Sequence, residues 1–151
     1  MVKIAIDPGV NGGLAIRYED GKVVAYPYDS ENDLIETISE TKTLCGGRCF
    51  AFVEQVQGYI GGAGGPGSAM FKFGQSYGFI LGALMALQVP IRLIRPQEWQ
   101  KRLGLGTSKS HASKAHWKRH LRDKASMMFP GMKVTLKTAD ALLILEATKN
   151  D

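Results

Sequence analysis

The sequence predicts an α/β fold with a mixed five-stranded sheet and helices on both faces of the sheet. Three short apolar stretches separated by turn residues open the chain, and an apolar run at 48–54 follows a helical pattern. Alternating strand and helix patterns complete the chain. Its 151 residues suit a single domain, 1–151, that buries about 68–70% of the surface exposed by the unfolded chain.

The first three strands are expected at residues 2–7, 13–18 and 22–28. The sequence PGVNGG supplies the first turn, and the pair Asp20 and Gly21 supplies the second. Turns this short join neighbouring antiparallel strands. The chain is therefore expected to begin with an antiparallel meander.

A helix is expected at 31–43, because Ser30 can cap it and apolar side chains recur on one of its faces. The run 48–54 reads as a buried strand, since residues such as Phe50 and Phe52 leave it no polar face. A helix placed between two strands allows them to run parallel. The fourth strand is thus expected to lie parallel to an earlier one.

Residues 58–67, GYIGGAGGPG, contain six glycines and a proline, which predicts a loop. A helix is expected at 68–87, where apolar residues recur at helical spacing. Gly74, Gly78 and Gly82 fall four residues apart on this helix. Their spacing would allow another backbone to pack closely against it.

Four shorter elements are expected in the rest of the chain. They are a strand at 91–94, a helical turn from Pro96 through Leu103, a helix at 108–127 and a last helix at 138–149. In the last helix, Leu142 and Leu145 would pack inward.

The chain is basic, with a net charge of +5 and a pI of about 9.3, a balance that favours polyanionic partners. Residues 19–42 hold seven acidic and two basic side chains, whereas residues 92–124 hold ten basic and two acidic ones. One surface should therefore be strongly electropositive. We expect a cytoplasmic protein without a membrane partner, because no apolar run approaches the roughly 20 residues that span a bilayer and no signal sequence is apparent.

Neither the cysteines nor the histidines predict a metal site. Cys45 and Cys49 stand four residues apart without a second cysteine pair or a nearby histidine, so we expect reduced thiols. His111, His116 and His120 are expected to be exposed on the basic surface.

Three carboxylates stand at the ends of apolar stretches. Asp7 closes KIAID, Glu54 closes CFAFVE and Asp140 opens the helical run DALLILEA. Carboxylates gathered at the rim of a buried sheet are stabilised by a shared divalent metal ion. Two such ions can activate water, stabilise a leaving oxygen and neutralise phosphate charge, so the three residues predict a metal-dependent phosphodiesterase. The structural alternative is a turn cap at Asp7 and solvated carboxylates at the other two positions.

Four motifs in order sharpen this interpretation: IDPG, VEQV, KFGQSYG and ADALLI. Together they resemble the RuvC-type Holliday junction resolvases, and PQEWQKRLGL resembles the phage-borne branch. The resemblance covers nearly the whole chain and implies an RNase H-like fold. It also implies a homodimer that makes paired nicks in a four-way DNA junction. Asp7, Glu54 and Asp140 would then hold Mg²⁺, for which Mn²⁺ would substitute.

Lys137 departs from the family's pattern. These nucleases normally carry an Asp or His three residues before the final aspartate, and a protonated lysine cannot ligate Mg²⁺. Glu146 could substitute, the second ion could be weakly held, Lys137 could offset phosphate charge, or the site could be weakened. Glu146 is disfavoured, because six helical residues turn through about 600° and point it roughly 120° away from Asp140. Lys137 is retained as a candidate catalytic residue.

Two other functions are compatible with parts of the sequence. Lys137 motivates a branched-DNA-binding module of the same fold with weak or lost cleavage. The sequence DPGVNGG also resembles the first phosphate loop of actin-like sugar kinases, but those enzymes need a second domain. The glycine-rich loop lacks the Gly-Lys-Ser or Gly-Lys-Thr ending of a nucleotide P-loop, so no nucleotide cofactor is expected.

The basic segment provides candidate DNA contacts. Lys114, Lys118 and Arg122 recur every four residues and form one stripe that suits a phosphate backbone. The ordinary alternative is a solvated helix face. The resemblance adds Lys109 as a backbone contact just before this helix.

Further DNA contacts are expected around the glycine-rich loop. In the resembled family this loop presses a hydrophobic side chain onto unpaired bases. Gln57 stands at that position here, so Tyr59 or Ile60 would take the role. Lys72 and Gln75, in the KFGQSYG motif, are also candidate contacts. The structural alternative for the loop is a plain connector.

Overall fold

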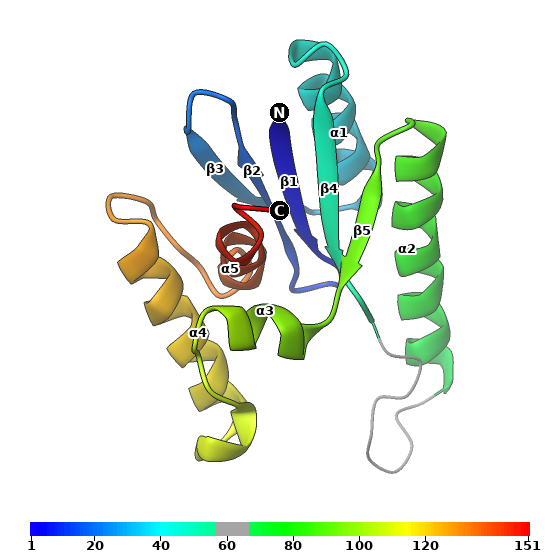
Figure 1. Ribbon diagram of the computed structural model, residues 1–151. Helices are drawn as coiled ribbons and strands as arrows, with labels where there is room; N and C mark the ends of the chain where they lie inside the picture. The colour runs from blue at the N-terminus through cyan, green and yellow to red at the C-terminus, as the bar shows by residue number, and fades with distance from the viewer. Residues whose placement is uncertain (57–66) are drawn as a thin grey trace.

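The computed structural model describes residues 1–56 and 67–151, and within them one sheet has the strand order β3-β2-β1-β4-β5 (Figure 1). The strands are β1 (Val2–Asp7), β2 (Gly13–Arg17), β3 (Val23–Pro27), β4 (Cys49–Glu54) and β5 (Ile91–Ile94). The β1–β2 and β2–β3 pairs are antiparallel, whereas the β1–β4 and β4–β5 pairs are parallel. The predicted meander and mixed five-stranded sheet are confirmed.

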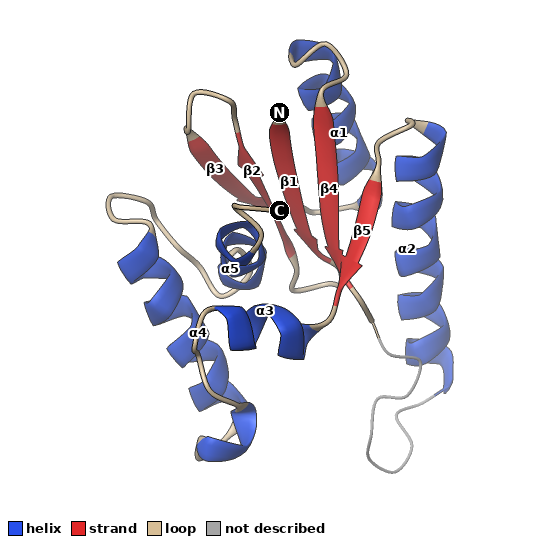
Figure 2. Cartoon of the chain, in the orientation of Figure 1, coloured by secondary structure: helices blue, strands red, loops and turns tan. Residues whose placement is uncertain are grey.

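Helices cover both faces of the sheet, as predicted (Figure 1, Figure 2). One face carries α1 (Glu31–Leu44) and α2 (Gly67–Ala86), and the other carries α3 (Pro96–Arg102), α4 (Lys114–Met128) and α5 (Ala139–Ala147). Each face has its own apolar core. Ile4 of β1 packs with Leu34 of α1 and Ile80 of α2. Ala5 and Phe52 belong to the core beneath α3, α4 and α5.

The alternation of side chains along a strand places two of the predicted carboxylates on one face. Asp7 lies two residues after Ala5 on β1, and Glu54 lies two residues after Phe52 on β4. Both therefore face the α5 side of the sheet. Because β1 and β4 are parallel, they end at the same edge, where Asp7 and Glu54 follow the paired residues Ile6 and Val53.

The helix predicted at 108–127 begins later, at Lys114. Ser113 is its N-cap, and its hydroxyl oxygen accepts a hydrogen bond from the His116 N–H at 3.1 Å. His111 is extended, with φ −114° and ψ 150°, and separates α4 from a short 3₁₀ turn at Ser108–Ser110. The serines compete for backbone hydrogen bonds that a longer helix would need. Lys109 consequently lies in a separate segment ahead of α4.

The glycine-spaced side of α2 faces away from the described part of the chain. Only Ile80 and Leu84 are buried in this helix. A Cβ added at Gly74, Gly78 or Gly82 would meet no atom within 4 Å. Although α2 is apolar, every helix in residues 1–56 and 67–151 is too short or too polar to traverse a bilayer.

Candidate active site

The three predicted carboxylates converge at the carboxyl ends of the parallel strands. Asp7 and Glu54 end the neighbouring strands β1 and β4, and Asp140 lies in the first turn of α5, which packs across β1 and β2. Asp140 is buried, with 4% of its surface exposed. The charge of Asp140 raises the pKa of both Asp7 and Glu54, so the three groups act on one another electrostatically.

Two glycines allow Asp7 and Asp140 to approach. A Cβ at Gly12 would stand 1.9 Å from the carbonyl oxygen of Asp7, and one at Gly13 would stand 2.4 Å from the carbonyl oxygen of Lys137. No side chain fits at either position, so the turn after β1 packs directly on the backbone before α5. Gly12 and Gly13 of DPGVNGG thus serve close backbone packing.

Tyr28, which directly follows β3, fixes the same turn. Its hydroxyl oxygen accepts a hydrogen bond from the Gly9 N–H at 3.0 Å, and its O–H lies 3.2 Å from the Gly9 carbonyl oxygen. Burial raises the pKa of Tyr28 to about 12, so the hydroxyl keeps its proton at physiological pH. The backbone next to Asp7 is therefore held in place.

Burial and mutual repulsion disfavour the charged forms of the carboxylates. Burial raises the pKa of Asp7 well above its ordinary value, and Asp140 and Glu54 raise it further. Burial and the charge of Asp140 raise the pKa of Glu54 to about 7, although a hydrogen bond from Trp99 opposes the shift. Such a cluster needs a cation to hold all its charges at neutral pH.

Lys118 of α4 supplies one cation. Its ammonium group donates a hydrogen bond to Asp140 Oδ2. Burial alone would lower the pKa of Lys118, but Asp140, Asp7 and Glu54 outweigh that effect and raise it. Lys118 is therefore a charged part of the carboxylate cluster, a role that its place in a basic stripe did not predict.

The donor set fits a hard divalent cation such as Mg²⁺. All three side chains offer carboxylate oxygens, which are the ligands that these ions prefer. Asp140 Oδ1 is buried and finds no hydrogen-bond partner in the described part of the chain. Among residues 1–56 and 67–151, no three acidic, histidine or cysteine side chains lie close enough together, as they are placed here, to hold a metal ion. Lys118 takes one oxygen of Asp140 instead.

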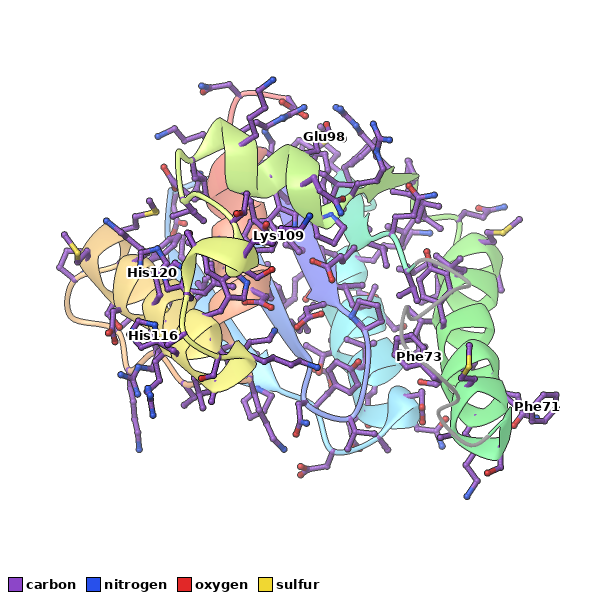
Figure 3. All side chains as sticks on the ribbon, turned by 90° about the horizontal axis from the view of Figure 1, so that it is seen from below. Phe71, Phe73, Glu98, Lys109, His116 and His120 are labelled. Carbon is purple, nitrogen blue, oxygen red and sulfur yellow. The ribbon has the colours of Figure 1, made fainter. Side chains whose placement is uncertain are left out.

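A cleft of about 580 Å³ opens beside the carboxylates. Glu54 and Asp140 line it together with Lys109, Lys114 and Lys118, so its acidic groups meet a basic rim. Figure 3 looks at the carboxyl ends of the strands, with Lys109 near the centre of the view. An anionic chain that enters the cleft would meet lysines as it reaches the carboxylates.

Two of the solved structures that match this chain are RuvC structures from Thermus thermophilus. RuvC alone matches with 19% sequence identity and a TM-score of 0.59, over 97% of this chain and 92% of that chain. RuvC in complex with a Holliday junction substrate matches with 18% identity and a TM-score of 0.58, over 97% and 91% of the two chains. This chain has the RuvC fold. No protein-family model and no curated protein matches the sequence.

The RNase H-like fold expected from the motifs is therefore confirmed. Within this RuvC fold, Lys137 lies in the turn before α5 and its side chain is exposed. α5 begins at Ala139 with Thr138 as its N-cap, so Lys137 precedes the helix. Glu146, the alternative considered from the sequence, pairs with Arg17 at 2.6 Å and with Lys149 at 2.5 Å.

The remaining candidate DNA contacts lie in different places. Arg122 does not line the cleft and pairs with its neighbour Asp123 at 2.7 Å. Lys72 and Gln75 are exposed on α2 and line a different groove, which also contains Glu31. Gln57, Tyr59 and Ile60 lie outside the described residues.

The three histidines gather around Trp117 at the start of α4. The ring of His111 lies 4.6 Å from that of His120 and 5.2 Å from that of His116, measured between centroids. Trp117 stacks on His120 at 5.4 Å. Figure 3 shows His116 and His120 on α4, to one side of the strand ends. His116 is exposed as expected, whereas His111 and His120 are half-buried.

Trp99 was not among the predicted site residues. Its indole N–H donates a hydrogen bond to Glu54 Oε2 at 2.8 Å, and the side chain is 1% exposed. The sequence alone carries no signal for this contact, because it depends on the pairing of β5 with β4, which makes α3 start beside Glu54.

Proposed function

We propose that this protein is a metal-dependent endonuclease that resolves branched DNA, with a four-way junction as its main substrate. The observation that carries the proposal is the convergence of Asp7, Glu54 and Asp140 beside a lysine-lined cleft. The RuvC fold supports it, because one of the matching structures contains a Holliday junction substrate.

Hydrolysis of a phosphodiester needs an activated water, a stabilised leaving oxygen and neutralised phosphate charge. Bound Mg²⁺ or Mn²⁺ would supply these effects. Asp7, Glu54 and Asp140 would hold the ion through carboxylate oxygens, and Asp140 Oδ1 is a buried acceptor without a partner among the described residues. Tyr28 and the glycines after Asp7 keep the backbone around these ligands in place.

The lysines of the cleft would bind the DNA strand that is cut. Lys109 and Lys114 line the cleft and have no carboxylate partner in the described structure, so they are available to phosphate oxygens. Lys118 balances the charge of Asp140 before substrate arrives. Once a bound cation neutralises the charge of Asp140, the ammonium group of Lys118 would be free to turn toward the phosphate.

Paired nicks in a junction require two active sites, and therefore a dimer. We assign the interface to the outer side of α2, where Gly74, Gly78 and Gly82 are open to the outside. Phe71 is 67% exposed and Met85 is 70% exposed, so this side also carries uncovered apolar surface. Figure 3 shows Phe71 pointing away from the domain, in contrast to Phe73, which points inward.

A branched-DNA-binding module with weak cleavage is the second candidate. Lys137 favours it, because a lysine stands where the resembled nucleases have a further ligand. The cleft lysines would serve binding equally well in either case. The two candidates differ only in whether the strand is cut.

One gel experiment separates the candidates. Purified protein is incubated with a labelled four-way junction or with a linear duplex of equal length, with Mg²⁺ or with EDTA. The endonuclease cuts the junction in paired positions with Mg²⁺ only, and Asp7→Asn binds the junction without cutting it. Binding without cutting by the wild-type protein supports the module. Equal binding of junction and duplex would remove branch selectivity from the proposal.

A further inference from the structure

Trp99 joins the PQEWQ segment directly to the carboxylate cluster. Its indole Nε1–H donates to Glu54 Oε2 at 2.8 Å, and only 1% of the residue is exposed. Both groups line the cleft, where Trp99 is buried and Glu54 is half-buried. The donor side of the hydrogen bond is therefore shielded from competition by water.

The position of the indole is fixed by the elements beneath it. The Gln55 N–H donates to the Ile94 carbonyl oxygen at 2.8 Å, so the ends of β4 and β5 lie level. α3 then starts at Pro96, whose fixed φ suits the first turn of a helix. Trp99 follows in that helix and reaches back over the end of β4.

Ion pairs hold the outer side of the same helix. Arg102 donates to Glu98 Oε1 at 2.8 Å and to Asp151 Oδ1 at 2.9 Å. Arg92 of β5 also donates to Glu98 Oε1, at 3.1 Å. α3 is thus tied to β5 and to the segment after α5. Trp99 approaches Glu54 from a braced element rather than from a free loop.

We propose that Trp99 is a positioning residue for the metal site. Its indole N–H holds one oxygen of Glu54, which fixes the rotamer of the carboxylate and leaves Oε1 available as the ligand oxygen. The assignment rests on the proposed function, because it takes Glu54 to be a ligand. Trp99 itself touches neither the ion nor the phosphate.

The chemistry of indole suits this role. An indole N–H is a donor only and does not titrate, so it demands an acceptor oxygen at every pH. Without it, Oε2 of the half-buried Glu54 would lose its partner and the carboxylate would gain rotamers. Loss of a group that orients a metal ligand typically costs about 10- to 100-fold in metal affinity.

Trp99→Phe tests the proposal, and Trp117→Phe is the matched control. Trp117 lines the same cleft and is 6% exposed, but no carboxylate in the described structure accepts from its indole. Mn²⁺ affinity is measured by titration calorimetry on the DNA-free protein. We expect Trp99→Phe to weaken Mn²⁺ binding about 10- to 100-fold and Trp117→Phe to leave it at the wild-type value. Equal affinities for all three proteins would overturn the proposal.

A measurement on the unaltered chain covers the case in which Trp99→Phe does not fold. The sequence has two tryptophans, so a ¹⁵N spectrum shows two indole signals, which Trp117→Phe assigns. Saturating Mg²⁺ should shift the Trp99 signal and leave that of Trp117 nearly in place. An unmoved Trp99 signal in a protein that binds Mg²⁺ contradicts the inference alone. A wild-type protein that binds no divalent ion contradicts the proposed function itself.

Discussion

Lys118 on α4 and Asp140 on α5 form an ion pair at the floor of the cleft. The side chain of Asp140 is 6% exposed and that of Lys118 is 39% exposed, so the acid is buried and the base reaches it from the solvent side. A lysine of the chain thereby stands in for part of the positive charge that the carboxylates require.

Lys118→Met should destabilise the metal-free protein. Removing one partner of a buried ion pair leaves an uncompensated charge, which typically costs about 3–5 kcal/mol. Because Lys118 is partly exposed, we expect a loss of about 1–3 kcal/mol in the free energy of unfolding at pH 8 in EDTA. Urea denaturation measures it. Lys114→Met, an exposed position one turn earlier, should change stability by less than about 0.5 kcal/mol; an equal loss in both variants would mean that the ion pair contributes nothing.

Glu54→Gln should stabilise the metal-free protein, and increasingly so as pH rises. The folded-state pKa of Glu54 is about 7, above its ordinary value of 4.5. Its contribution to stability is therefore full below about pH 4.5 and is lost as pH rises through 7. The variant has no titrating carboxylate at this position, so it does not lose stability in this way. In EDTA its free energy of unfolding should therefore exceed that of the wild-type protein by a difference that grows between pH 5 and pH 8 to on the order of 2 kcal/mol. Thermal melts across this range measure the difference, and Glu36→Gln on the exposed side of α1 controls for the loss of one carboxylate. A pH-independent difference would contradict the coupling of Glu54 to its neighbours.

Lys109→Ala and Lys114→Ala should each weaken binding to every DNA substrate. Each lost phosphate contact should flatten the slope of log affinity against log salt concentration by about 0.9. Fluorescence anisotropy in EDTA, over a series of salt concentrations, measures the slope without cleavage. Lys22→Ala, at the exposed turn between β2 and β3, removes the same charge away from the cleft and should keep the wild-type slope. Unchanged slopes in the two cleft variants would mean that these lysines are solvated surface residues that do not contact phosphate.

Lys137→Asp should tighten metal binding and raise Mg²⁺-dependent cleavage. The substitution places a carboxylate at the position where the resembled nucleases have an Asp or His, and a fuller ligand set holds a second ion better. Initial cleavage rates over a range of Mg²⁺ concentrations measure both effects. A fall in rate of about 10²- to 10³-fold would instead identify Lys137 as a group that stabilises phosphate charge. Unchanged kinetics would remove residue 137 from the active site.

Gly78→Arg should convert a dimer into monomers without unfolding the chain. No atom lies within 4 Å of a Cβ added at Gly78, so the monomer has room for a side chain there. A charged side chain would, however, keep a second α2 at a distance. Light scattering should give about twice 16.5 kDa for the wild-type protein and 16.5 kDa for the variant. Glu36→Arg, exposed on α1, should remain dimeric. A wild-type monomer, with and without junction DNA, would count against the interface and against symmetric incision.

The sheet and its carboxylates could be predicted because their signals are local. Turn residues separate the first three strands, and strand alternation places Asp7 and Glu54 on one face. Asp140 could be added because it opens an apolar helix that had to cover the sheet. The convergence of the three groups follows from those placements, since parallel strands end at one edge.

Other features depend on contacts that spacing does not encode. The start of α4 was misplaced because Ser113 is an N-cap within a run that otherwise suits a helix. In the sequence, Lys118 could not be distinguished from Lys114 and Arg122, which belong to the same basic stripe. Only the packing of α4 against α5 brings Lys118 to Asp140. Trp99 was missed because its partner, Glu54, is 45 residues away in the sequence.

The packing of Gly13 on Lys137 makes the geometry of the site depend on a residue that has no side chain. An alanine at position 13 would place a methyl group 2.4 Å from the Lys137 carbonyl oxygen. Relief of that clash would move the start of α5, and Asp140 with it, away from Asp7 and Glu54. In a mutational scan, position 13 would therefore be as intolerant as a ligand, although it contributes no donor atom.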